Sequence, residues 1–103
     1  MSKWIYDLSS VGEDLRVSIE SKEATIDACK LIIENVSRCF KWIKQNCPES
    51  VSSYFEHYTE ILQETQEDLE GLSDQDYFYA ESAVNEILET FCDLCDMHRI
   101  WIN

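Results

Sequence analysis

Apolar residues recur at alternating intervals of three and four over three long segments of this sequence. This spacing places side chains on one face of an α-helix. The residues are Ile26, Cys29, Ile33, Val36, Phe40, Ile43 and Cys47 in the first segment, Val51, Phe55, Tyr58, Leu62, Leu69 and Leu72 in the second, and Tyr77, Ala80, Val84, Ile87, Phe91, Leu94, His98 and Trp101 in the third. Two Gly and one Pro in 103 residues are too few for the turns of a many-stranded sandwich or barrel. The sequence therefore predicts an all-α fold.

Two breaks separate the three segments. Pro48 is expected in or near the first turn of the second helix, because its fixed φ suits that position. Gly71 is a candidate stop for the second helix, and Ser73 with Asp76 forms a capping-box pattern that predicts the start of the third.

The first periodic segment extends backwards as far as Leu15. A single helix from Leu15 to Cys47 would be longer than its partners, so we expect a break within it. Ser18 and Ser21 are candidate N-caps after this break, and Ser10 is a candidate N-cap for an earlier helix.

The predicted fold is a small antiparallel bundle of four helices, with residues 1–103 forming a single domain. Two alternatives remain at this point. One is a three-helix bundle. The other places a β-hairpin, formed by residues 4–6 and 15–20, before three helices, because residues 15–20 also alternate with a period of two.

The negative charge of the chain is concentrated in its second half. The whole sequence carries 21 acidic and 8 basic residues, a formal net charge of −13. Residues 1–48 hold seven residues of each sign, whereas residues 49–103 hold fourteen acidic residues and a single basic one, Arg99. This charge opposes direct binding to nucleic acid or to an anionic membrane and favours a basic protein partner, including a protein that itself binds nucleic acid.

Many of these acidic residues fall on the helix faces opposite the apolar faces. At 100° per residue they form two acidic ribbons. The first ribbon contains Glu49, Glu56, Glu60, Glu64 and Glu67, and the second contains Asp74, Glu81, Glu86, Glu89, Asp93 and Asp96. Like charges four residues apart repel, so this arrangement predicts a surface that docks on a basic patch. The alternative is that both ribbons only solvate the outside of the bundle.

Some aromatic residues do not fit the apolar faces. Tyr77, Phe78 and Tyr79 are consecutive, so at least one of Phe78 and Tyr79 should be exposed on a helix. Trp42 lies off the predicted apolar face, beside a basic patch formed by Arg38, Lys41 and Lys44. Aromatic residues of this kind are enriched at interface hot spots, and the basic patch could also meet an acidic ribbon of a second copy in a homodimer.

Five cysteines without an apolar leader segment predict free thiols in a reducing compartment, and we expect a cytoplasmic protein. Cys92, Cys95 and His98 are spaced like zinc ligands, but no obvious fourth ligand accompanies them, so no metal or other cofactor is expected. The sequence lacks the metalloprotease His-Glu-x-x-His motif, a phosphate-binding glycine loop and a Gly-x-Ser-x-Gly elbow. We expect no enzyme activity.

These observations predict a small acidic protein-binding module, most readily an inhibitor that occludes a basic site. Proteins of this kind include inhibitors of phage counter-defence, antitoxin or immunity type and nucleic-acid mimics. The predicted partner-binding residues are Glu56, Glu60, Glu64, Glu67, Glu86, Glu89, Asp93 and Asp96 for charge, and Phe78, Tyr79 and Trp42 for contact. The alternative is a structural subunit or adaptor that binds through its charge-balanced N-terminal segment and Trp42.

Overall fold

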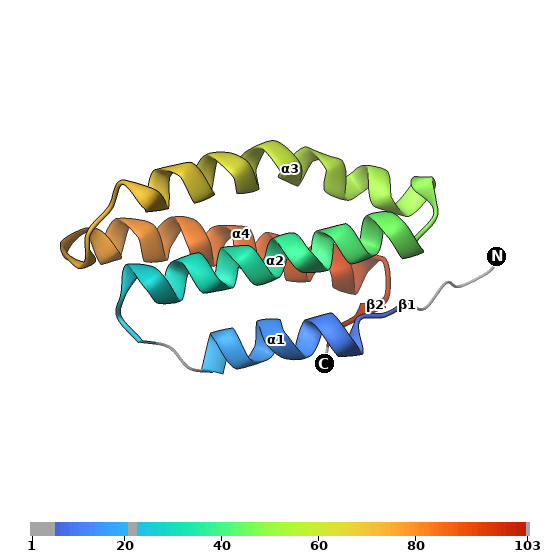
Figure 1. The fold of residues 1–103 in the computed structure, drawn as a ribbon. Coiled ribbons are helices and arrows are strands. Elements are labelled where there is room, and N and C mark those ends of the chain that lie inside the picture. Colours follow the sequence, from blue (N-terminus) through green and yellow to red (C-terminus); the bar gives the residue numbers. More distant parts are fainter. Residues whose placement is uncertain (1–5, 21–22, 103) are drawn as a thin grey trace.

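Four α-helices make up most of the described part of the chain. The computed structural model describes residues 6–20 and 23–102. Its helices are α1 (Ser9–Glu20), α2 (Ile26–Asn46), α3 (Glu49–Glu70) and α4 (Tyr77–Met97), with a 3-10 turn, η1 (Asp74–Asp76), directly before α4. Each helix runs antiparallel to the one before it (Figure 1). The predicted all-α fold with four helices is confirmed, and the three-helix alternative is wrong.

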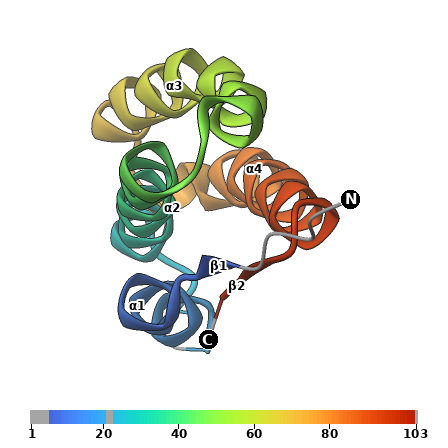
Figure 2. The same cartoon turned by 90° about the vertical axis from the view of Figure 1, so that its right-hand side faces the viewer.

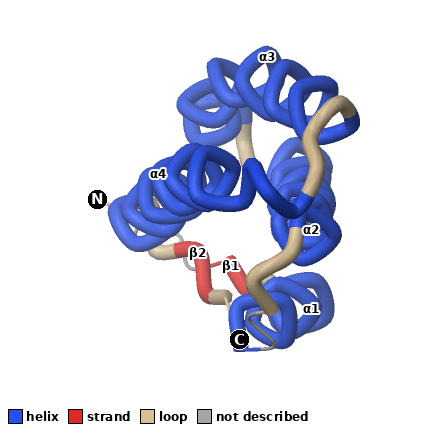
Figure 3. Tube along the Cα trace, turned by 90° about the vertical axis from the view of Figure 1, so that its left-hand side faces the viewer, coloured by secondary structure: helices blue, strands red, loops and turns tan. Residues whose placement is uncertain are grey.

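Two short strands join the first helix to the last. Viewed from the end, α2, α3 and α4 form a triangle, and α1 packs against α2 on the side away from α3 (Figure 2). Strands β1 (Tyr6–Asp7) and β2 (Ile100–Trp101) lie between α1 and α4 (Figure 3). They pair in parallel, and the Leu8 N–H donates to the Trp101 carbonyl at 2.7 Å.

The alternative with an N-terminal hairpin is wrong, because a parallel strand pair takes its place. Residues 15–20 lie within α1, and Tyr6 pairs with Ile100 rather than with them. Residues 4 and 5 of the predicted hairpin lie outside the described residues. The last helix also ends earlier than predicted, because Arg99 adopts a left-handed backbone conformation (φ 58°) that turns the chain into β2.

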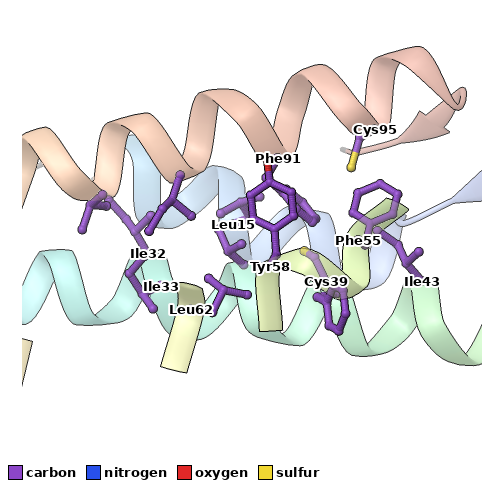
Figure 4. Close-up of a cluster of buried hydrophobic side chains, with 14 of the residues drawn as sticks. Leu15, Ile32, Ile33, Cys39, Ile43, Phe55, Tyr58, Leu62, Phe91 and Cys95 are labelled. Atoms are coloured by element: carbon purple, nitrogen blue, oxygen red, sulfur yellow. The ribbon is translucent and has the colours of Figure 1, made fainter. Parts of the chain in front are cut away.

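One hydrophobic core takes side chains from all four helices and from β2. Phe55 of α3 and Phe91 of α4 are fully buried at its centre, and their rings meet edge to face with centroids 5.7 Å apart (Figure 4). The predicted apolar faces are buried except near their ends, where Leu72, Tyr77, Leu94 and His98 are half-buried and Trp101 is exposed. Among the described residues, no helix combines the length and the apolarity needed to cross a membrane.

The starts of α1 and α2 differ from the predicted caps. Helix α1 begins at Ser9, whose N–H is accepted by the Asp7 carboxylate at 2.8 Å, so Ser10 lies inside the first turn. Helix α2 is capped by Thr25, whose hydroxyl accepts the Ala28 N–H at 3.2 Å. Ser18 cannot cap it because Ser18 is buried in α1, and the other candidate, Ser21, lies outside the described residues.

The predicted boundaries of α3 and the start of the last helix are confirmed. Pro48 is the N-cap of α3, and the helix stops at Gly71. Gly71 has a φ of −90°, so this stop does not use the left-handed conformation that glycine permits. The capping box between Ser73 and Asp76 is present, and it starts η1, which continues into α4.

A polar network fixes α1 on α2. The amide of Asn35, a buried residue of α2, donates to the Asp14 carbonyl at 3.1 Å and to the Ser18 hydroxyl, both on α1. Arg38 donates to the Asn35 side-chain oxygen at 3.3 Å and pairs with the Asp14 carboxylate at 2.7 Å. The bonds from Asn35 and Arg38 to Asp14 and Ser18 require one alignment of the two helices, so the network selects the register of α1.

Candidate partner-binding surface

All eight acidic residues predicted to bind a partner are exposed. Glu56, Glu60, Glu64 and Glu67 lie on α3, and Glu86, Glu89, Asp93 and Asp96 lie on α4. The two helices are neighbours, and their buried faces point towards the shared core (Figure 2). Both acidic ribbons therefore lie on the outside of the bundle, on adjacent helices.

These carboxylates lack a basic partner within the described chain. The ion pairs among described residues are Arg16–Glu20, at 4.0 Å, and Arg38–Asp14, and both lie on α1 and α2. Helices α3 and α4 contain no Lys or Arg. Solvent and salt therefore screen most of the negative charge of this surface.

Two members of the second predicted ribbon belong elsewhere. The carboxylate of Asp74 accepts the N–H of Ile26 at 2.9 Å, which places a negative charge at the N-terminus of α2. Glu81 is half-buried beside Tyr77 and Cys29, and burial together with this carboxylate raises the pKa of the Cys29 thiol. The free part of the second ribbon therefore begins at Glu86.

The two aromatic residues predicted at the start of the last helix are strongly exposed. Phe78 and Tyr79 have exposed fractions of 80% and 81%. Tyr77, in contrast, packs against the core, with its ring centroid 6.1 Å from that of Phe78. Helix geometry requires that at least one of the three be exposed, because three consecutive side chains cover more than half of the helix circumference.

The N-terminal candidates are less accessible than predicted. Trp42 is half-buried and packs against the core, so its ring offers less free surface than those of Phe78 and Tyr79. Arg38 is held by Asp14 and Asn35, which leaves Lys41 and Lys44 as the free charges of the basic patch. A homodimer held by this patch would therefore rely on two positively charged side chains, Lys41 and Lys44, in each copy.

The sequence did not identify a second exposed apolar group, at the opposite end of α3 and α4. Trp101 was expected on the buried face, but it is 58% exposed because α4 ends before it. Tyr54 and Met97 are 57% and 70% exposed. The ring of Tyr54 packs against His98 at a tilt of 42°, with centroids 4.6 Å apart, which places Tyr54 beside the C-terminus of α4. Sequence spacing could have placed Tyr54 on the same face of α3 as His57 and Ile61, because it lies three residues before the first and seven before the second.

The cysteines are packing residues of the helix interfaces. Burial raises the pKa of the Cys39 thiol to about 12 and that of Cys47 to about 11, and it also raises the pKa of Cys95. Protonated thiols are poor nucleophiles and poor metal ligands. Cys92 is half-buried, Cys95 is buried and His98 caps the end of α4. Within the described ranges, no three His, Cys, Asp or Glu residues are grouped so that they could hold a metal ion.

Comparisons of the chain with protein-family models, with curated proteins and with solved structures found no match. A function for the chain is therefore inferred from its own surface chemistry. The most distinctive part of that surface combines the unpaired carboxylates of α3 and α4 with the exposed aromatic rings at the start of α4.

Proposed function

We propose that this chain is a small acidic protein-binding module that docks the outer faces of α3 and α4 on a basic site of a partner protein. Docking occludes that site, so the module acts as an inhibitor. The observation that carries the proposal is the set of eight exposed carboxylates on two adjacent helices that contain no Lys or Arg.

The spacing of these carboxylates has an energetic cost in the free protein. Glu56, Glu60 and Glu64 follow one another at intervals of four, as do Glu89 and Asp93. Each such pair of like charges destabilises a helix by about 0.2–0.5 kcal/mol. A basic partner removes this repulsion when it binds, and the attraction between opposite surfaces raises the association rate.

The aromatic residues supply contact area that charge alone does not. Phe78 and Tyr79 expose about four fifths of their surface at the start of α4. Aromatic side chains are among the residues that contribute most to binding when they become desolvated. We therefore assign Phe78 and Tyr79 as apolar anchors beside the acidic surface.

A protein that holds nucleic-acid phosphates has the kind of basic groove that the two ribbons complement. Carboxylates arrayed along α3 and α4 would occupy the positions of phosphates and exclude the nucleic acid. This form of the proposal predicts that saturating duplex or single-stranded nucleic acid competes with the module for its partner.

The experiment is capture of the partner on immobilised protein, with elution by increasing salt, for the wild type and two variants of equal net charge. The test variant is Glu60→Lys/Glu64→Lys on α3. The control is Glu13→Lys/Glu23→Lys, because these residues are also exposed but lie in the charge-balanced half of the chain.

We expect the test variant to lose the captured partner at moderate salt and the control to retain it. Equal loss in both variants would show that only net charge matters, and retention in both would show that the acidic surface is not used. Either of these results would overturn the proposal. A partner that remains bound above about 1 M salt, where the Debye length is about 3 Å, would also contradict it.

A further inference from the structure

A groove runs between α3 and α4, on the same side of the bundle as the acidic ribbons. It has a volume of about 400 Å³. Its α3 wall contains His57, Tyr58, Ile61 and Thr65, and its α4 wall contains Ala83, Glu86, Ile87 and Thr90. Tyr58 and Ile87 are buried at its floor, whereas Ala83 is exposed at its edge. The groove thus has an apolar floor that solvent can reach from outside.

Exposed apolar side chains lie beyond both ends of this groove and in line with it. Tyr79 is one turn before Ala83, and Met97 is two turns after Thr90, so both lie on the face of α4 that lines the groove. Tyr54 lies near Met97 because its ring packs against His98, the next residue along the chain. The distance from Tyr79 to Met97 along α4 is about 27 Å at 1.5 Å per residue, which is about five helical turns.

The edges of the groove are acidic. Glu86 lines the groove itself, Asp93 lies two turns further along the same side of α4, and Glu64 follows Ile61 by three residues on α3. No Lys or Arg lies on either helix to balance them. A ligand that complements this groove needs an apolar stripe with positive charges on both sides of it.

A helix fits these walls better than an extended peptide does. Side chains form the walls, and the backbone groups of α3 and α4 are used within their own helices. An extended peptide would leave its N–H and C=O groups without partners there, whereas a helix satisfies them internally.

We propose that the α3–α4 groove binds a basic amphipathic helix of about five turns, with its apolar stripe towards Ile61 and Ile87 and its Lys and Arg residues beside Glu64, Glu86 and Asp93. This inference rests on the proposed function and names the part of the partner that is bound. Tyr54 and Met97 contact one end of the helix, and Tyr79 contacts the other end.

The test uses two synthetic 18-residue peptides of identical Leu, Lys and Ala composition. In the first peptide the leucines recur at intervals of three and four, and in the second they are distributed around the helix. Binding to the full chain is measured by fluorescence anisotropy, and the site is mapped by NMR amide shifts. The protein variants are Ala83→Lys, which fills the groove, and Ser82→Lys, which adds the same charge at the neighbouring exposed position.

We expect the amphipathic peptide to bind at least tenfold more tightly than its rearranged control. Ala83→Lys should weaken binding at least tenfold and Ser82→Lys less than threefold, with amide shifts concentrated at Ile61, Ala83 and Thr90. Failure of the amphipathic peptide to bind, or equal effects of the two lysine variants, would overturn the proposal that the groove binds a basic helix. If the captured partner still depends on Glu60 and Glu64 in that case, the proposed function stands and only this inference fails.

Discussion

Replacement of Asn35 by alanine tests whether the polar network between α1 and α2 stabilises the fold. The substitution removes two hydrogen bonds donated by a buried amide, to Asp14 and Ser18, and one accepted from Arg38. Each bond contributes about 1 kcal/mol net, and alanine regains about 0.6 kcal/mol through its higher helix propensity. We therefore expect the free energy of unfolding to fall by about 2 kcal/mol, which lowers Tm by roughly 10 °C in a chain of this size.

The assay is urea unfolding followed by circular dichroism, together with hydrogen exchange of the α1 amides. The matched control is Asn46→Ala, the same substitution on the same helix. The Asn46 side chain is exposed, and it donates to the carbonyl of Trp42 at 2.9 Å. Removal of an exposed bond of this kind should change stability by less than about 0.5 kcal/mol.

Exchange should become faster in α1 before the other helices, because α1 lies at the edge of the bundle against α2 (Figure 2). A loss below about 0.5 kcal/mol for Asn35→Ala, equal to that of the control, would show that α1 is held by apolar contacts alone. Uniformly faster exchange over all helices would refute the assignment of the network to the docking of α1.

Three further predictions concern the helix ends and the buried thiols. Asp74→Ala should lower the free energy of unfolding by about 1 kcal/mol, because the N-terminus of α2 loses both the acceptor for the Ile26 N–H and a favourable negative charge. Asp74→Asn should lower it less, and equal losses for the two variants in urea unfolding would contradict this explanation. His98→Phe keeps an aromatic ring and removes a buried Nε2 that has no hydrogen-bond partner, so thermal unfolding should show unchanged or higher stability. A fall of more than about 1 kcal/mol in the free energy of unfolding would instead show that this atom makes a hydrogen bond. Burial raises the pKa of Cys39 to about 12 and that of Cys47 to about 11, so the unfolded chain loses these protons at lower pH than the folded chain does. The free energy of unfolding should therefore fall as pH rises from about 9 towards 11. Urea unfolding at several pH values under reducing conditions measures this, and a constant stability would show that the thiols are solvated.

The sequence predicted the helices well where periodicity was strong. The buried faces around Ile33, Phe55 and Phe91 follow directly from intervals of three and four, because one helix face must cover the core. Pro48 was a correct boundary because its backbone preference is a local property, and α3 also stops at Gly71, although without the left-handed conformation that glycine permits.

The candidate surface was predicted in part for the same reason. Exposure of at least one of Phe78 and Tyr79 follows from their position beside Tyr77, and both are exposed in the structure. Exposure of the acidic residues follows from their place opposite the apolar face. The groove between α3 and α4 was not predicted, since periodicity on one helix does not show how closely a neighbouring helix approaches.

The sequence by itself determined the helical class, the positions of α2 to α4 apart from the start of α2 and the end of α4, and the concentration of negative charge on the last two helices. These properties depend on residue type and on spacing within a few turns. Only the tertiary structure decided that Tyr6 pairs with Ile100, that Asp74 meets the N-terminus of α2 and that Asn35 fixes α1. These contacts join residues 21 to 94 positions apart, and each competes with many other pairings that local sequence leaves equally open.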